Sequence, residues 1–77
     1  MEAYMQKLDF NLNGEYIELH SLLKATGVCD SGGAGKAIVA AGEVSVDGKV
    51  ELRKACKIRA DQIVTLGDVR INVLAAE

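Results

Sequence analysis

The stretch Ser31-Gly-Gly-Ala-Gly-Lys-Ala-Ile-Val-Ala-Ala-Gly-Glu-Val-Ser-Val-Asp-Gly-Lys-Val50 decides the fold of this 77-residue chain. Ser31 is a residue type that caps helix N-termini, and Gly42 suits the positive φ at which many helices end. An alternating segment, 44–46, follows directly and runs into Asp47-Gly48, a strong signal for a two-residue hairpin turn. The stretch therefore predicts a helix over 33–41 that leads straight into a β-hairpin.

A second helix is predicted just upstream, over 19–26. Its apolar residues recur at helical spacing and Gly27 ends it, whereas His20, Ser21 and Lys24 fall on the opposite, exposed face. On the helix 33–41 the residues at helical spacing are small, which predicts close packing of that face against the first helix. This packing face comprises Ala34, Ala37, Ile38 and Ala41. Lys36 is then left on the outward face of its helix.

The remaining segments are predicted to form strands and turns. Residues 8–12 alternate between apolar and polar, and Asn13-Gly14 predicts a reversal, so an N-terminal hairpin is expected over 5–17. Gly67-Asp68 predicts a second tight turn near the C-terminus. The fold class predicted is α+β, two packed helices followed by a small, mainly antiparallel sheet. The chain is expected to form one domain, 1–77, with the helix pair at 18–42 and the sheet at 43–74.

Composition narrows the possible functions. The net charge is −2, yet residues 49–59 carry five basic side chains against one acid. Phosphates respond to the field within about 8 Å, so this local excess counts for more than the total. The polar N-terminus and the lack of a long apolar run predict a cytoplasmic protein with no membrane segment. Cys29 and Cys56 lack metal-ligand spacing, which favours free thiols over a disulfide or a zinc site.

The segment Gly32-Gly33-Ala34-Gly35-Lys36 looks like a phosphate-binding loop of nucleotidases. That loop needs a glycine five residues before Gly35 and a serine or threonine after the lysine. Here those positions hold Asp30 and Ala37, and the segment follows a helix rather than a strand. The chain also shows no nucleophile-base set and no paired carboxylates. We therefore expect no enzyme, no catalytic residues, no metal and no cofactor.

The two helices, Gly42 and the segment 43–49 together resemble the RNA-binding domain first named for ribosomal small-subunit protein four, also called the αL motif. The small free-standing bacterial members, the YbcJ-like and YaaA-like proteins, are more similar still, through residues 15–19, Ser31-Gly32-Gly33, 46–48 and 51–58. The resemblance covers about 17–66. It implies RNA binding by the second helix, the turn before it and the following hairpin. Glu18 and Gly32 depart from it, because many members have arginines there.

We accordingly expect a non-catalytic, monomeric protein that binds structured RNA, for example ribosomal or transfer RNA. Tyr4, Phe10 and Tyr16 all lie outside the basic stretch, so recognition by backbone and shape is favoured over base stacking. The negative total charge and the two missing arginines favour an alternative, a protein-interaction module or accessory subunit of an RNA-related complex. The candidate RNA-binding residues are Lys24, Ser31, Gly32, Lys36, Lys49, Arg53, Lys54, Lys57 and Arg59.

Overall fold

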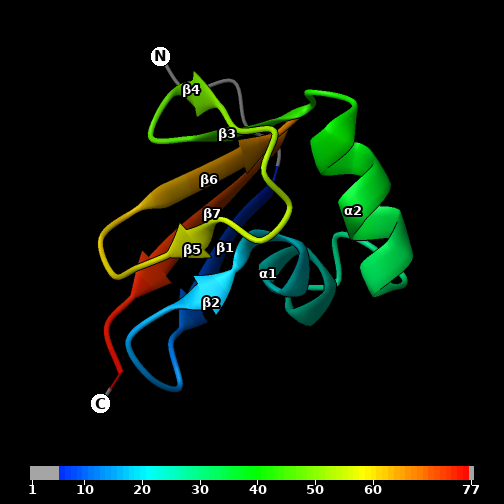
Figure 1. Ribbon diagram of the computed structural model, residues 1–77. Coiled ribbons are helices and arrows are strands. Elements are labelled where there is room, and N and C mark those ends of the chain that lie inside the picture. The colour runs from blue at the N-terminus through cyan, green and yellow to red at the C-terminus, as the bar shows by residue number, and fades with distance from the viewer. Residues whose placement is uncertain (1–5, 77) are drawn as a thin grey trace.

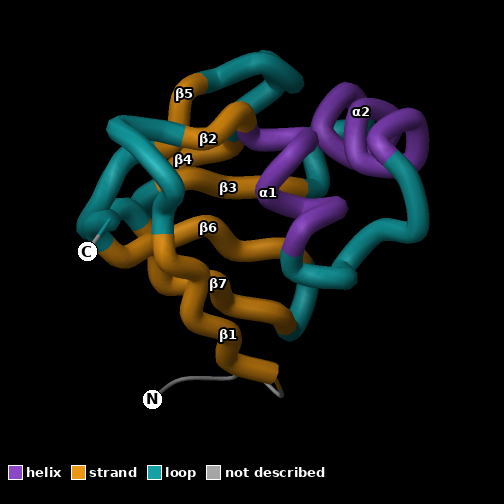
Figure 2. Tube along the Cα trace, turned by 90° about the horizontal axis from the view of Figure 1, so that it is seen from below, coloured by secondary structure: helices purple, strands orange, loops and turns teal. Residues whose placement is uncertain are grey.

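The computed structural model describes residues 6–76. A five-stranded sheet has the strand order β1-β7-β6-β3-β4, and β2 and β5 form a separate two-stranded sheet beside α1 (Figure 1). The elements in chain order are β1 (Gln6–Asn11), β2 (Ile17–Glu18), α1 (Leu19–Ala25), α2 (Gly32–Ala40), β3 (Val44–Val46), β4 (Lys49–Val50), β5 (Lys57–Ile58), β6 (Ile63–Leu66) and β7 (Val69–Leu74). The two helices lie side by side in both views (Figures 1 and 2). The α+β class is therefore confirmed.

The predicted N-terminal hairpin is wrong. β1 pairs in parallel with β7, and β2 pairs with β5. Neither Asn13 nor Gly14 adopts the positive φ that a two-residue hairpin turn requires, so no such turn forms there. Instead Leu12 N–H donates to the carbonyl of Leu74 at 3.0 Å, which extends the ladder with β7. Met5, the first residue of that predicted hairpin, lies outside the described residues.

The remaining sheet is antiparallel, as predicted. β3 pairs with both β4 and β6, and β6 pairs with β7 across the Gly67-Asp68 turn. Gly67 has a φ of +58°, which suits the first central position of a type II′ turn. The parallel pair β1–β7 is the exception, and it makes the sheet mainly, not wholly, antiparallel.

Both helices begin and end within one residue of their predicted bounds. Gly27 and Gly42 follow them with φ of +79° and +77°, as expected for helix stops. The hydroxyl of Ser31 caps α2 by accepting a hydrogen bond from the Ala34 N–H at 3.1 Å. No helix within residues 6–76 is long and apolar enough to cross a membrane.

The face of α2 that meets α1 differs from the predicted one. Gly35 and Val39 are buried, whereas Ala37 and Ala41 are exposed. A Cβ on Gly35 would lie 3.1 Å from the backbone oxygen of His20, so the absence of a side chain allows the helices to approach this closely. His20 is consequently half-buried, not exposed, and its Nε2 lies 3.3 Å from Glu18 Oε1.

A continuous aliphatic core joins α1 to the strands. α1 supplies Leu19, Leu22 and Leu23, all fully buried, and α2 supplies Val39. The strands add the other fully buried side chains, which are Val44, Ile58, Val64, Ile71 and Val73. Burial of each such side chain stabilises the fold by about 1.5–3 kcal/mol relative to exposure. The elements α1, α2 and β5, which carry Lys24, Lys36 and Lys57, are thereby attached to one core.

The turn between β3 and β4 is tied to a third strand. Asp47 and Gly48 have φ of +52° and +86°, the two positive values of a type I′ turn. The Asp47 carboxylate accepts hydrogen bonds from the Ile63 N–H at 2.9 Å and from Gln62 Nε2 at 3.1 Å. Asp47 N–H donates back to the Ile63 carbonyl at 2.8 Å. Asp47 therefore serves both as a turn residue and as a link between this hairpin and the start of β6.

Replacement of Gly42 by alanine is expected to lower the free energy of unfolding by about 1 kcal/mol, because an L-residue is strained at a φ of +77°. Steric overlap adds little, since the nearest atom to the new methyl group is Leu52 Cδ2 at 3.6 Å. Urea denaturation measures the change. Gly14→Ala is the control, because a methyl group there meets nothing within 4 Å. Equal losses in the two variants would contradict the assigned helix stop.

Candidate functional site

The loop 51–56, between β4 and β5, carries the centre of the basic stretch. It crosses from the β3–β4 hairpin to β2 and α1 (Figure 1). At its start the Glu51 N–H donates to the Val44 carbonyl at 3.0 Å, and the Cys56 N–H closes a turn on the Arg53 carbonyl at 3.1 Å. These bonds fix the loop to the sheet at one end and fold it on itself at the other.

The same loop caps α1. Glu18, the N-cap residue of α1, makes no side-chain capping bond. Instead the Leu19 N–H donates to the Cys56 carbonyl at 2.9 Å, and the His20 N–H donates to the Lys54 carbonyl at 3.0 Å. N–H groups in the first turn of a helix have no partner within the helix, so the loop satisfies donors that would otherwise need a cap. The loop backbone is thus held while the Lys54 side chain stays exposed.

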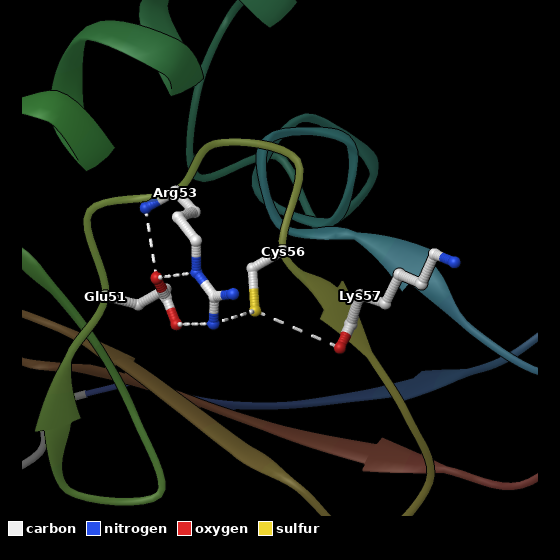
Figure 3. Close-up of polar contacts among 4 residues, drawn as sticks. All are labelled: Glu51, Arg53, Cys56 and Lys57. Atoms are coloured by element: carbon white, nitrogen blue, oxygen red, sulfur yellow. Dashed lines mark hydrogen bonds and ion pairs between the residues drawn. The ribbon is translucent and has the colours of Figure 1, made fainter.

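Arg53 is held by Glu51 (Figure 3). Its Nε and Nη2 donate to the two carboxylate oxygens at 2.9 and 3.0 Å, and its backbone N–H donates to Oε2 at 3.0 Å. These hydrogen bonds lower the pKa of Glu51 to about 2 and raise the pKa of Arg53. The Glu51 side chain is only 17% exposed, whereas that of Arg53 is 77% exposed. The guanidinium therefore faces solvent in a fixed orientation with part of its charge neutralised.

Basic residues of β4, the loop 51–56 and β5 line two adjoining hollows. The first, of about 830 Å³, is lined by both apolar and cationic residues. Its lining residues are Ala40, Leu52, Arg53, Lys54, Ala55, Cys56 and Lys57. The second shares Arg53, Cys56 and Lys57 with the first and adds Lys49. Lys36 is exposed on α2 four residues before Ala40, on the helix face that borders the first hollow.

An aromatic ring joins the basic stretch through the β2–β5 pairing. Tyr16 precedes β2, and its ring centroid lies 5.0 Å from Lys57 Nζ and 5.6 Å from Arg59 Cζ. Both distances fall within the range of cation–π attraction. No aromatic residue lies within the basic stretch of the sequence, but the fold places the Tyr16 ring beside it. The expectation that no aromatic side chain accompanies the basic residues is therefore wrong. No local pattern signals this contact, because it depends on strand pairing across some forty residues.

Three predicted residues lie elsewhere. Lys24 is in the last turn of α1, while Ser31 and Gly32 begin α2, so all three surround the connection between the helices. The loop 51–56, in contrast, meets the first turn of α1 and the last turn of α2. We use the name basic surface for the residues gathered around this loop and Tyr16. The basic surface consists of Lys36, Lys49, Arg53, Lys54, Lys57 and Arg59.

Both cysteines are free thiols, as expected. Cys29 is buried, and burial raises its pKa. Cys56 lies 3.9 Å from Arg53 Nη2 and 4.0 Å from the Lys57 carbonyl oxygen (Figure 3). Burial and the hydrogen bond with Glu51 raise its pKa as well, which lowers the thiolate fraction and hence its nucleophilicity. Among residues 6–76, no three histidine, cysteine or acidic side chains lie together as metal ligands.

Comparison with known proteins agrees with this architecture. A family model described as S4 domain matches residues 10–74 of the chain. The chain belongs to the S4 domain family. YbcJ of Escherichia coli strain K12, and YbcJ of Shigella flexneri, are each 45% identical to it over 60 residues, which is 78% of this chain and 86% of each relative.

The solved structures include a similar fold. The solution structure of YbcJ from E. coli, described as revealing an αL motif involved in RNA binding, matches with a TM-score of 0.67 and 37% identity. It covers 97% of this chain and 94% of that one. The resemblance to the αL motif and to YbcJ-like proteins is therefore confirmed. The site residues, the monomeric state, the cytoplasmic location and the absence of catalysis stay predictions.

The Glu51–Arg53 pair gives a testable pH dependence. Because the folded state lowers the pKa of Glu51 from 4.5 to about 2, the pair stabilises the fold above pH 4.5 and this contribution is lost as the pH falls towards 2. An NMR titration of the Glu51 carboxyl carbon is expected to show a midpoint near the lower value. Arg53→Met should move that midpoint up towards 4.5, whereas Lys54→Met should leave it in place. A midpoint unaffected by Arg53→Met would contradict the assigned pair.

Proposed function

We propose that this protein binds structured RNA without catalysis, through the basic surface. The observation that carries the proposal is the loop 51–56, whose backbone is fixed to β3 and to α1 while its cationic side chains point outward. Membership of the S4 domain family and the RNA-binding motif described for YbcJ support it. The raised pKa of the Cys56 thiol lowers its thiolate fraction, which argues against a nucleophilic role for this residue.

Phosphate contacts supply most of the affinity in this proposal. Lysine is a compact point charge on a flexible stem, so Lys36, Lys54 and Lys57 can adjust to the backbone of an RNA helix. Arg53 differs, because Glu51 holds its guanidinium and Nη2 also lies near Cys56 Sγ, so mainly the Nη1 N–H groups of this exposed side chain are available to a phosphate. Lys24, Ser31 and Gly32 meet the RNA only where it extends along the helix connection.

A salt series tests the proposal directly. With four to six phosphates neutralised, log K should fall with log salt at a slope of about −3 to −5, given roughly −0.7 to −0.9 per contact. An RNA hairpin and an unstructured strand of the same length should be compared over this series. Tighter binding of the hairpin is expected, since an array of fixed cations reads backbone shape. Binding that does not respond to salt would contradict the proposal.

Removal of two lysine charges should weaken RNA binding without affecting the fold. In Lys36→Gln/Lys54→Gln the salt slope should become shallower by about 1.5 and the affinity at moderate salt should fall roughly tenfold, because two phosphate contacts are lost. Gln6→Glu/Asn11→Asp is the control. It makes the same change in net charge on exposed positions of β1, at the opposite edge of the sheet from β4. Equal losses of affinity in both variants would show that only net charge matters.

Glu51→Gln should instead strengthen RNA binding. The substitution removes a negative charge that lies 2.9 Å from Arg53 Nε, so the guanidinium becomes available to a phosphate. The affinity should rise about threefold or more and the salt slope should steepen by less than one unit. Filter binding across the same salt series measures both effects. A fall in affinity would mean that Glu51 serves mainly to hold the loop in its binding conformation.

A second candidate function is protein interaction, and one observation favours it. Val50 and Leu52 are 60% and 62% exposed, and β4 is an edge strand of the sheet. Val50 on this strand edge and Leu52 in the loop just after it offer exposed apolar surface to a partner chain. Val50→Ser/Leu52→Ser should abolish such an interaction but preserve binding to an RNA hairpin. Nuclease treatment of the wild-type complex provides the complementary test, because a direct protein partner stays bound after the RNA is removed.

A further inference from the structure

We infer that Tyr16 stacks on one unpaired base of the bound RNA, with Lys57 and Arg59 holding the adjacent phosphates. The inference rests on the proposed function and adds a specificity determinant to it. A charged surface reads only the backbone, which is common to every RNA. An aromatic ring among the same cations can distinguish an RNA that offers an unstacked base from one whose bases are all paired.

The β2–β5 pair sets the direction of the ring. Ile17 pairs with Ile58, which is fully buried, so these side chains face the core. Because side chains alternate along a strand, the residues on either side of them face outward. Tyr16 continues β2 at the position opposite Arg59, and Lys57 lies two residues from Arg59 on the same face. The ring and both cations therefore occupy one solvent-facing surface.

The ring is accessible but restrained. Tyr16 is 42% exposed, and its centroid lies 5.0 Å from Lys57 Nζ and 5.6 Å from Arg59 Cζ. A tyrosine has few rotatable bonds, and two cation–π contacts limit its motion further. Because both cations lie over the ring, a base stacks on it as Lys57 and Arg59 move from the ring to the flanking phosphates. Phosphates on either side of that base would meet Lys57 and Arg59 at the same time.

A purely structural role of Tyr16 can be distinguished from base stacking. If Tyr16 only held the two cations in place, its loss would weaken binding of every RNA to the same degree. If it stacks on a base, its loss should matter only when the RNA presents an unpaired base. The two roles therefore predict different patterns across a set of matched RNAs, and the comparison needs no knowledge of the natural ligand.

The first experiment uses three RNA hairpins of one stem sequence. One carries a single bulged uridine, the second has an abasic residue at the bulge, and the third is fully paired. The wild-type protein should prefer the bulged uridine, and Tyr16→Leu should lower affinity for that hairpin by about 5- to 100-fold with little change for the other two. Tyr16→Phe keeps the ring and should retain the preference. Thermal melts of both variants check that the fold is intact.

The second experiment reports on the ring itself. The chain contains two tyrosines, Tyr4 and Tyr16, and no tryptophan. In a Tyr4→Phe background, tyrosine emission arises from Tyr16 alone. The bulged uridine should quench this emission on binding, and the abasic hairpin should quench it much less, because quenching requires contact between the base and the ring.

The outcomes distinguish failure of the stacking inference from failure of the proposed RNA binding. Equal affinity of the wild type for the three hairpins, a uniform loss in Tyr16→Leu, or quenching that does not depend on the base would overturn the inference and leave the proposed RNA binding intact. Absence of salt-dependent binding to all three hairpins would overturn the proposed function and the inference together. A preference for the bulged uridine that disappears in Tyr16→Leu and persists in Tyr16→Phe supports the inference.

Discussion

Two hydrogen bonds attach the loop 51–56 to the first turn of α1, and the placement of the basic surface depends on them. The Leu19 and His20 N–H groups donate to the carbonyls of Cys56 and Lys54, at 2.9 and 3.0 Å. Glu18 makes no side-chain cap, so the helix depends on the loop for its first donors. The loop in turn depends on the helix, because a basic segment with exposed side chains has little apolar surface to bury. Each element thus supplies what the other lacks.

The residues that specify local backbone geometry made much of the fold predictable. Gly27, Gly42 and Asp47-Gly48 all adopt positive φ. Glycine and aspartate are among the few residue types that favour such backbone angles, so these positions could be recognised from the sequence. Helix bounds and the central hairpin follow from them. Asn13-Gly14 carries the same signal yet forms no hairpin, since the alternating strand β1 finds its partner in β7. Burial of a strand against an existing sheet outweighed the turn propensity of two residues.

The candidate site was predictable as a set of charges but not as a surface. The basic residues were evident from the sequence, whereas the pair of Arg53 with Glu51 and the contact of Tyr16 with Lys57 depend on how the loop folds. The packing of α1 against α2 was likewise predictable only in part. Small residues indicated close contact, but the contact is made by Gly35, because the backbone oxygen of His20 leaves no room for a Cβ. The contacts of Tyr16 with Lys57 and of Gly35 with His20 join residues that are distant in the sequence, so no local pattern indicates them.

Clustering of the basic residues lets a chain of net charge −2 present a positively charged surface, and one acid, Glu51, lies within it. Glu51 accepts a backbone and two side-chain hydrogen bonds from Arg53, so it orders the loop while it reduces the local charge. Glu51 therefore has two opposite effects on phosphate binding: it fixes the Arg53 side chain, and it lowers the positive charge around it. A fixed guanidinium loses less conformational freedom when a phosphate arrives, and this gain offsets part of the attraction that the carboxylate removes. A rigid site with moderate charge favours ligands whose shape matches it over polyanions in general.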